Sequence, residues 1–232
     1  MGGIDETDRE LVERFLRQHA ELYGPEVFVP ARAQAPAVPT ADPLRAYYEE
    51  IRHCRKCPLA ERRTHFVFGV GNPHARVMLI GEAPGADEDR LGEPFVGRAG
   101  QLLTRLLRES GFAREEVYIA NILKCRPPEN RDPLPTEIAL CFPYLRKQIE
   151  LIAPDFIVAL GRIAAHTLLN TTTPLNKLRG VVHGCAGARL IVTYHPAAIL
   201  RAPQFEEPAR QDLRMLRMLY EQKYGSASSA KA

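Results

Sequence analysis

The chain has 232 residues, of which 45% are hydrophobic and 25% charged, and this is the composition of an ordinary globular protein. The formal net charge of +3 is too weak to establish a nucleic-acid partner by itself. No apolar run approaches the roughly 18 residues of a membrane span, and residues 1–6 carry no signal-peptide pattern, so we expect a cytoplasmic protein.

The N-terminal segment differs in character from the rest of the chain. Residues 5–23 predict an amphipathic helix, because apolar side chains such as Leu11 and Phe15 fall on one stripe. Residues 24–41 are rich in proline and alanine, which is typical of an extended linker. We therefore expect a helical segment over residues 1–23 that is tethered to the rest of the chain and whose partner is unknown.

The main domain is expected over residues 42–224. Asp42 followed by Pro43 is a good helix start, with aspartate as N-cap and proline at the first helical position. The Ser/Ala-rich residues 225–232 predict a disordered tail.

Strands and helices alternate within this domain. Strands are expected at residues 77–80, 117–121, 156–160 and 190–194. Helices are expected at residues 101–110, 136–151, 161–169 and 208–220. The alternation favours a three-layer α/β/α sandwich around a mostly parallel four-stranded sheet. Loops that follow parallel strands then meet at one edge of the sheet, where ligands bind in folds of this class.

A loop dense in glycine and proline follows the first predicted strand, over residues 81–97. Glycine and proline residues at this density allow the main chain to approach a ligand closely. The loop carries one aromatic residue, Phe95, and five acids, which are Glu82, Asp87, Glu88, Asp89 and Glu93. The alternative is an acidic surface loop that Phe95 merely anchors.

Two further polar residues lie at predicted strand ends. Asn121 ends the second strand, and its amide offers both a donor and an acceptor to an amide-like partner; closing a local turn is the alternative. His195 follows the last strand and precedes Pro196, which restricts its backbone. A structural role for His195 is the alternative.

Five cysteines supply a separate signal. Cys54 and Cys57 form a C-x2-C pair, and Cys125 and Cys141 can complete a four-cysteine set for zinc or an iron–sulfur cluster. A redox pair and unrelated buried cysteines are the alternatives. Cys185 stands apart in a glycine-rich segment and is expected in a turn.

Four ordered segments carry a family resemblance. They are GEAPG from Gly81, PFVG from Pro94, Asn121 with KCRPP from Lys124, and HPAAIL from His195. Together with the four cysteines, these segments closely resemble the motifs of the family 4 uracil-DNA glycosylases, iron–sulfur members of their superfamily. The resemblance spans about residues 54–200, in the order of the family, and leaves the N-terminal helix and linker outside.

The resemblance implies base excision, in which deoxyuridine is flipped out of DNA and its N-glycosidic bond is hydrolysed. Uracil would be released and an abasic site left behind. Phe95 would stack on the base and Asn121 would read its edge, with Gly81 and Gly85 also at the substrate. His195 would stabilise negative charge that develops on uracil O2.

Activation of the water is a separate question. The family 1 enzymes carry an aspartate in the first motif where this chain has Ala83. We expect the backbone at Ala83, with Glu82 or Glu88, to hold the attacking water. The alternative is that these carboxylates only hydrogen-bond the loop.

The resemblance also implies a [4Fe–4S] cluster on Cys54, Cys57, Cys125 and Cys141, with an architectural role; zinc is the less favoured occupant. The implied partner is uracil-containing DNA, single- or double-stranded, bound by a monomer that associates with the nucleoid in a prokaryote. Basic residues are candidates for phosphate contacts: Arg52, Arg55, Lys56, Arg62, Arg63, Lys124, Arg126, Arg131 and Arg201.

Three other interpretations compete with this one. Relatives that trap uracil-DNA covalently carry glutamine in the first motif and a basic insertion, whereas this chain has Glu82 and a short segment over 178–183. A catalytically silent DNA-binding module is disfavoured because Glu82, Phe95, Asn121 and His195 occur together. A zinc-stabilised nucleotide-binding protein would need a phosphate-binding loop, and no G-x-x-x-x-G-K-[ST] occurs.

Overall fold

The computed structural model describes residues 42–225. The helix predicted over residues 1–23, the linker over 24–41 and the tail beyond Gly225 lie outside this range and stay predictions.

The first described helix, α2 (Pro43–Ile51), begins as predicted. The Asp42 carboxylate accepts a hydrogen bond from the Leu44 N–H at 3.0 Å, which satisfies one of the free donors at the helix start. Pro43 occupies the first helical position, where no N–H is needed.

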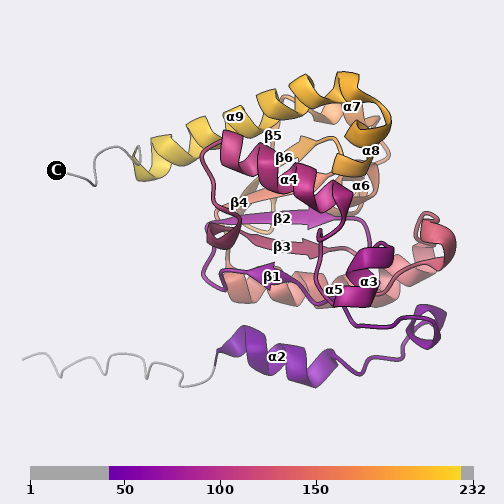
Figure 1. Ribbon diagram of the computed structural model, residues 1–232. Helices are drawn as coiled ribbons and strands as arrows, with labels where there is room; N and C mark the ends of the chain where they lie inside the picture. The colour runs from indigo at the N-terminus through magenta and orange to yellow at the C-terminus, as the bar shows by residue number, and fades with distance from the viewer. Residues whose placement is uncertain (1–41, 226–232) are drawn as a thin grey trace, which may run out of the picture. The chain divides into compact units, whose positions relative to one another are not determined.

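Six strands form one sheet in the order β1-β3-β2-β4-β6-β5, which Figure 1 shows from bottom to top. The central strands are β2 (Val77–Gly81), β3 (Tyr118–Asn121), β4 (Phe156–Leu160) and β6 (Ala188–Thr193). All neighbouring pairs among them are parallel. Their residues are almost all buried, as expected for parallel strands covered on both faces. The α/β/α class and the mostly parallel sheet are therefore confirmed.

The expected number of strands was too small, because each edge of the sheet carries an additional antiparallel strand. These are β1 (Val70–Gly71), which pairs with β3, and β5 (Val182–Cys185), which pairs with β6. Two residues are too few for a periodic signal, and β5 is only half-buried. Ala186 and Gly187 both have positive φ and make the two-residue turn to β6, so Cys185 ends a strand immediately before a turn.

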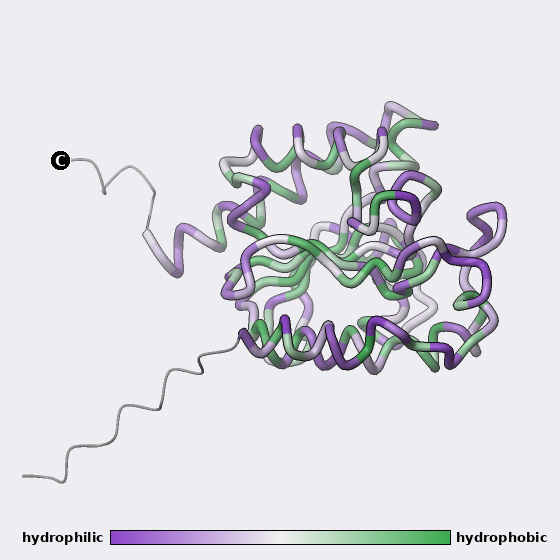
Figure 2. The backbone as a smooth tube through the Cα atoms, turned by 60° about the horizontal axis from the view of Figure 1, so that its bottom comes forward, coloured by the Kyte–Doolittle hydropathy of each residue, from purple (hydrophilic) through white to green (hydrophobic). Residues whose placement is uncertain are grey.

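Helices cover both faces of the sheet. One face is covered by α4 (Arg98–Glu109), α8 (Pro196–Arg201) and α9 (Glu206–Tyr224). The other is covered by α2, α5 (Pro135–Ile152), α6 (Arg162–Leu169) and α7 (Leu175–Leu178). Alternate residues of each strand face opposite hydrophobic cores, so the strands are hydrophobic along their length. Figure 2 shows this, and it also shows that hydrophobic and hydrophilic residues alternate along the helices.

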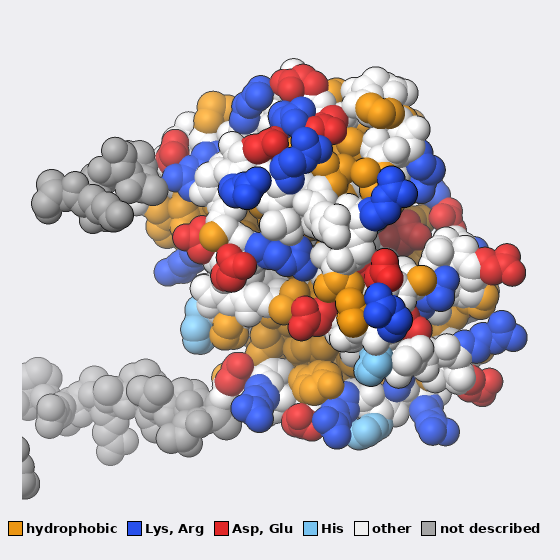
Figure 3. Space-filling view, viewed as in Figure 1, with side chains coloured by type: hydrophobic (Ala, Val, Ile, Leu, Met, Phe, Trp, Pro, Cys, Tyr) orange, Lys and Arg blue, Asp and Glu red, His pale blue; other side chains and the backbone are white. Residues whose placement is uncertain are grey.

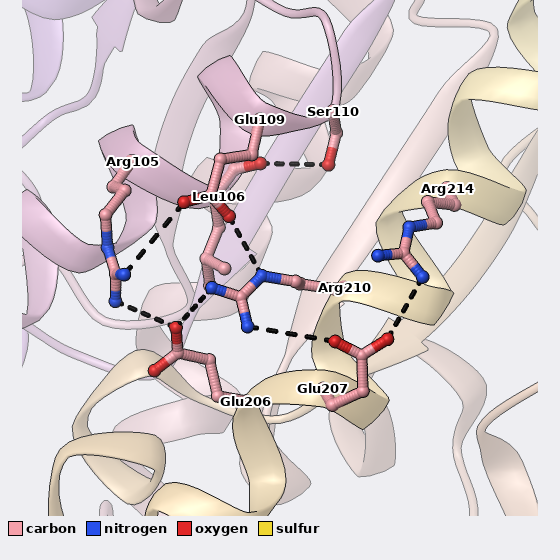
Figure 4. A network of polar contacts seen from close by, with 8 residues as sticks. All are labelled: Arg105, Leu106, Glu109, Ser110, Glu206, Glu207, Arg210 and Arg214. Atoms are coloured by element: carbon pink, nitrogen blue, oxygen red, sulfur yellow. Dashed lines mark hydrogen bonds and ion pairs between the residues drawn. The ribbon is translucent and has the colours of Figure 1, made fainter.

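The contact between α4 and α9 combines a buried apolar layer with surface ion pairs, which Figure 4 shows from close by. Arg210 donates to Glu109 at 2.9 Å and to Glu206 at 2.6 Å, and Arg105 donates to Glu206 at 2.9 Å. Partly exposed pairs of this kind contribute only about 0–1 kcal/mol each, so buried side chains such as Leu213 hold the helices together. Figure 3 shows basic and acidic side chains interspersed over this face.

Short helical segments fill the connections. A six-residue helix, α3 (Ala86–Leu91), interrupts the loop predicted over residues 81–97, with Asp87, Glu88 and Asp89 in its first turn and Gly92 in a left-handed cap. The surrounding glycines and prolines conceal such a short helix in the sequence. The 3₁₀ segments are Pro58–Glu61, Arg114–Glu116, Pro128–Asn130 and Pro203–Phe205. No helix within residues 42–225 is long and apolar enough to cross a membrane.

Candidate functional site

A cavity of about 520 Å³ lies where the four parallel strands end. Its walls include Glu82 after β2, Asn121 at the end of β3, Gly161 after β4 and His195 after β6. The structure thus brings together the strand-end residues that the sequence analysis singled out, as the parallel arrangement requires.

Asn121 and Phe95 meet over Gly81 in this cavity. Asn121 is only 2% exposed, and its Oδ1 has no hydrogen-bond partner among the described residues. A Cβ on Gly81 would lie 2.4 Å from this oxygen and 2.6 Å from Cζ of Phe95, so only glycine permits the close approach. An unpaired buried acceptor costs about 1–3 kcal/mol, and a ligand that donates to Oδ1 would recover this free energy.

Phe95 forms an aromatic wall beside His195. Its φ of 55° is unusual for a residue other than glycine, and its side chain is buried. The ring centroids of Phe95 and His195 lie 5.5 Å apart at an interplanar angle of 34°. A Cβ on Gly100 would lie 1.7 Å from the Phe95 carbonyl oxygen, so this glycine lets the first turn of α4 pack under the strained residue.

His195 is the N-cap of α8, and this fixes its tautomer. Its Nδ1 accepts a hydrogen bond from the Ala197 N–H at 3.1 Å, so the proton of the neutral ring resides on Nε2. Burial, together with the charge of Arg201, lowers the pKa of His195 to about 4. A Cβ on Gly161 would lie 2.8 Å from the Cβ of His195. The site therefore holds a neutral imidazole that is available to donate from Nε2.

Glu82 is a carboxyl in the cavity wall whose pKa is shifted. Burial, and secondarily the charge of Asp132, raises its pKa to about 7, while Arg162 and Arg201 oppose the shift. A carboxylate whose pKa lies near neutral pH is well matched to proton transfer. Ala83 follows it and also lines the cavity.

Glu88 is engaged by the loop itself. Its Oε1 accepts from the N–H groups of Val96 and Gly97, both at 3.0 Å, and its Oε2 accepts from the Gly85 N–H at 3.1 Å. The carboxylate thus ties the segment before α3 to the segment that carries Phe95. These contacts agree with the alternative that Glu88 only hydrogen-bonds the loop, although its carboxylate also borders the cavity.

Ion pairs border the mouth of the cavity. Arg162 donates to Asp132 at 2.6 Å, and both side chains are more than half exposed. Arg131 makes a bidentate contact with the buried Glu137, at 2.6 and 2.9 Å. Arg131 is therefore partly committed to holding the start of α5.

The four cysteines of the predicted metal site pack into the same core cluster. Cys125 and Cys141 are buried, whereas Cys54 and Cys57 are half-buried. Their sulfurs accept hydrogen bonds from Nη1 of Arg63 and the hydroxyl of Tyr144, both at 3.2 Å, and from the backbone of Lys124 at 3.3 Å. Arg63, a candidate for phosphate contacts, instead faces a sulfur.

The four thiols are compatible with more than one kind of metal centre. Within residues 42–225, no group of three or more cysteine, histidine or acidic side chains is placed around a single ion. A structural zinc site would need four ligands at about 2.0–2.3 Å from one ion. An iron–sulfur cluster of four irons is also held by four cysteine thiolates. Burial raises the pKa of the Cys141 thiol to about 12, and a bound metal cation would reverse this effect.

Known proteins match most of this chain. The model of the uracil DNA glycosylase superfamily matches residues 68–216. The chain is 47% identical to a type-4 uracil-DNA glycosylase of Archaeoglobus fulgidus, over 72% of this chain and 88% of the relative. It is 49% identical to one of Thermotoga maritima, over 66% and 81%, and 44% identical to one of Pyrobaculum aerophilum, over 74% and 92%.

This chain belongs to the type-4 uracil-DNA glycosylase family. The family resemblance inferred from the motifs is thereby confirmed. The matched region contains every residue that lines the cavity, from Glu82 to Arg201, and it also contains Cys125 and Cys141.

Sequence reasoning missed a buried polar network behind the cavity. Lys124 was a candidate for phosphate contacts, but its side chain is 0% exposed, so that expectation was wrong. Its Nζ donates to Oε1 of Gln148 at 2.5 Å and to the carbonyl oxygens of Phe68 and Asn121 at 3.0 Å. Burial lowers the pKa of Lys124 to about 7, against the effect of the nearby thiols. No local pattern in the sequence distinguishes a buried lysine from an exposed one at the end of a strand.

Proposed function

We propose that this chain is a DNA-repair glycosylase that removes uracil from DNA by hydrolysing the N-glycosidic bond of deoxyuridine. The observation that carries the proposal is the unpaired, buried Oδ1 of Asn121, next to the ring of Phe95 in the cavity that also holds His195. The family membership established above supports the same activity.

Asn121 would recognise uracil by its hydrogen-bonding edge. Its Oδ1 would accept from uracil N3–H, and its amide group would donate to O4. Cytosine presents the reverse pattern of donor and acceptor on these atoms, so it would leave buried groups unpaired at a cost of about 1–3 kcal/mol each. Phe95 would stack on the face of the base.

Access to the base requires that the nucleotide leave the DNA stack. The cavity of about 520 Å³ is in the size range of small-molecule sites and suits a flipped nucleoside. The cations Arg162 and Arg201 line the cavity and would lie near the phosphates that flank the flipped nucleotide.

His195 would stabilise the leaving uracil. Cleavage leaves negative charge on the base, and a neutral Nε2–H aimed at O2 provides a hydrogen bond that strengthens as the charge develops. The hydrogen bond from Ala197 to Nδ1 holds the ring in this tautomer. Replacing one donor of this type in other enzymes costs about 100- to 1000-fold in rate.

Glu82 and the backbone at Ala83 would hold the attacking water. The raised pKa of Glu82, about 7, lets its carboxylate accept a proton near neutral pH. The same negative charge would stabilise the cationic sugar of the transition state. Glu88 would keep the loop in place through its three backbone contacts rather than bind the water itself.

We assign Cys54, Cys57, Cys125 and Cys141 as the ligands of a [4Fe–4S] cluster. Support comes from their shared core location and from hydrogen-bond donors on three of the four sulfurs. When bound, the cluster would supply positive charge to the buried thiolates and cross-link three segments of the chain. The assignment favours an architectural role for the cluster, and no catalytic step depends on it.

The decisive experiment is cleavage of a labelled oligonucleotide that contains one deoxyuridine, with cytosine and thymine oligonucleotides as controls. We expect alkali-labile breakage only at uracil, and its loss in Asn121→Ala. Asn72→Ala is the matched control, because the side chain of Asn72 accepts only from the His74 N–H, in a turn that precedes β2 at the opposite end of the strand from the cavity.

Other outcomes would identify the competing functions. An SDS-resistant protein–DNA adduct would make the chain a covalent trap for uracil-DNA. Binding without release of uracil and without an adduct would leave a reader of uracil-DNA that lacks catalysis. Cleavage that persists in Asn121→Ala would remove Asn121 from base recognition.

A further inference from the structure

The ammonium group of Lys124 is fully enclosed and makes three hydrogen bonds. Its acceptors come from three segments: Phe68 before β1, Asn121 at the end of β3, and Gln148 in α5. An ammonium has three donors, so each one is used. Lysine is almost never fully buried unless it is paired, and this degree of enclosure calls for a specific cause.

Gln148 fixes the lysine in turn. It is also 0% exposed, and its Nε2 donates to the Phe68 carbonyl at 3.0 Å and to the Tyr118 hydroxyl at 3.3 Å. The amide therefore has one possible orientation, with Oε1 toward Lys124. The result is a closed polar network in which each hydrogen-bond acceptor of the lysine is itself held in place.

The network acts on the residue that we propose reads uracil. Beyond Asn121, the backbone N–H groups of Ile122 and Leu123 donate to Gly81 and Glu82, at 2.9 and 3.0 Å. These bonds hold the chain to the extension of β2. Lys124 adds a bond to the carbonyl of Asn121 itself at 3.0 Å, so the peptide group that follows the reading residue is held by a side chain three positions farther along.

Rotation of that peptide group would swing the Asn121 side chain within the cavity. The amide lies against Phe95 and Gly81 with an unpaired oxygen, and only a small displacement separates a productive from an unproductive hydrogen bond to a base. A hydrogen bond from the enclosed Nζ of Lys124 to this carbonyl opposes such rotation more strongly than a bond to water would, because the surroundings have a low dielectric constant.

We propose that Lys124 is a positioning residue for uracil recognition, whose ammonium holds the main chain of Asn121 so that its amide faces the base. This inference rests on the proposed function of Asn121. Lys124 touches neither base nor phosphate, because it is enclosed on all sides. It acts through Asn121 alone.

The test compares Lys124→Met with Tyr118→Phe in single-turnover cleavage of deoxyuridine DNA. Methionine has a similar length and cannot hold the carbonyl, and we expect the rate to fall by about 100-fold, the effect of displacing a reacting group by roughly 1 Å. Tyr118→Phe removes a different contact of the same network, the acceptor for Gln148, and should change the rate by less than about threefold.

Three further measurements separate positioning from a loss of stability. Binding of an oligonucleotide with an abasic site should be the same in Lys124→Met and the wild type, because that ligand has no base for Asn121 to read. In an Asn121→Ala background, Lys124→Met should lower the residual single-turnover rate, followed at high enzyme concentration over long incubation, by less than about threefold more, since residues that act through one another are not additive. Iron content should be unchanged, because the bond to Cys141 comes from the backbone N–H of Lys124.

The outcomes separate this inference from the function on which it rests. A wild-type chain that does not release uracil would overturn the proposed function. If the wild type is active, two results would overturn only the role of Lys124. One is an unchanged cleavage rate in Lys124→Met. The other is a double variant in which the effects of Lys124→Met and Asn121→Ala are fully additive. If Lys124→Met does not fold, Lys124→Gln retains a polar end that is too short for all three acceptors, and the same comparisons apply to it.

Discussion

Burial shifts two ionisable side chains of the cavity in opposite directions. The pKa of Glu82 is raised to about 7 and that of His195 is lowered to about 4. The physical cause is the same, because removal from water disfavours the charged form of an acid and of a base alike. Near pH 8 the pair therefore consists of a carboxylate and a neutral imidazole, which are the forms that water activation and uracil departure require.

We expect the single-turnover rate of uracil release to rise with pH and to level off above roughly pH 8, because Glu82 must lose its proton to accept one from water. His195 remains neutral far above its pKa of about 4 and adds no inflection in this range. Glu82→Gln should abolish the inflection and lower the plateau by about 100-fold or more. An unchanged profile in this variant would exclude Glu82 from the mechanism.

Glu82→Gln also measures how much the Glu82 carboxylate destabilises the folded protein. Because the pKa of Glu82 is raised from 4.5 to about 7, the folded state binds more protons than the unfolded state between these values, and stability falls as the pH rises through them. We expect Glu82→Gln to be more stable than the wild type by roughly 1–3 kcal/mol at pH 8, and equal to it near pH 4, in urea unfolding. A variant that is less stable at pH 8 would contradict this sign.

At the scale of elements, the loop between β2 and α4 owes its shape to one carboxylate and one short helix. Glu88 in α3 accepts three backbone N–H groups, two of them directly after Phe95. Asp89 in the same helix accepts from the Thr64 N–H at 2.9 Å and so holds α3 to the segment that follows the C-x2-C pair. The loop is therefore a rigid support for Phe95 rather than a flexible lid.

Glu88→Gln should weaken this support, because an amide offers one acceptor oxygen where the carboxylate offers two. We expect the variant to lose about 1–3 kcal/mol of stability and to cleave uracil DNA more slowly while keeping the pH inflection of the wild type. Asp87→Asn is the matched control, since Asp87 pairs only with the exposed Arg90, and its loss should cost less than about 0.5 kcal/mol. If Glu88→Gln lost the pH inflection of the cleavage rate, Glu88 rather than Glu82 would be the carboxylate that holds the attacking water.

At the scale of the whole molecule, the four cysteines come from segments that are far apart in the sequence. Cys54 and Cys57 follow α2, Cys125 follows β3 and Cys141 lies in α5. Cys125 is four residues from Asn121, and the backbone of the intervening Lys124 donates to Cys141. A cluster at this place would hold the first and third segments against the strand end that carries the reading residue.

We expect Cys141→Ser to lose iron and acid-labile sulfide and to unfold at a lower temperature, because binding free energy at a structural metal site is also folding free energy. The connection over residues 122–134 should become more sensitive to proteolysis. Cys185→Ser is the matched control, because Cys185 lies in β5, outside the four-cysteine set. Full iron content in Cys141→Ser, or its absence from the wild type, would contradict the assignment.

The sequence by itself determined the α/β class, the central strands and the residues at their ends. Apolar runs bounded by glycine and proline are local signals, and parallel strands necessarily bring Glu82, Asn121 and His195 to one edge. The same local signals did not reveal α3 or the edge strands β1 and β5, because each is short or only half-buried.

Only the tertiary structure decided how these residues are used. Nδ1 of His195 accepts a hydrogen bond from the start of α8. The carboxylate of Glu88 accepts from N–H groups eight and nine residues farther along the chain. Nζ of Lys124 donates to Phe68 and Gln148 in other segments of the chain. Lysine and glutamate look alike in a sequence whether they face water or the interior. Their partners lie on other elements, and packing of those elements fixes which donors and acceptors meet.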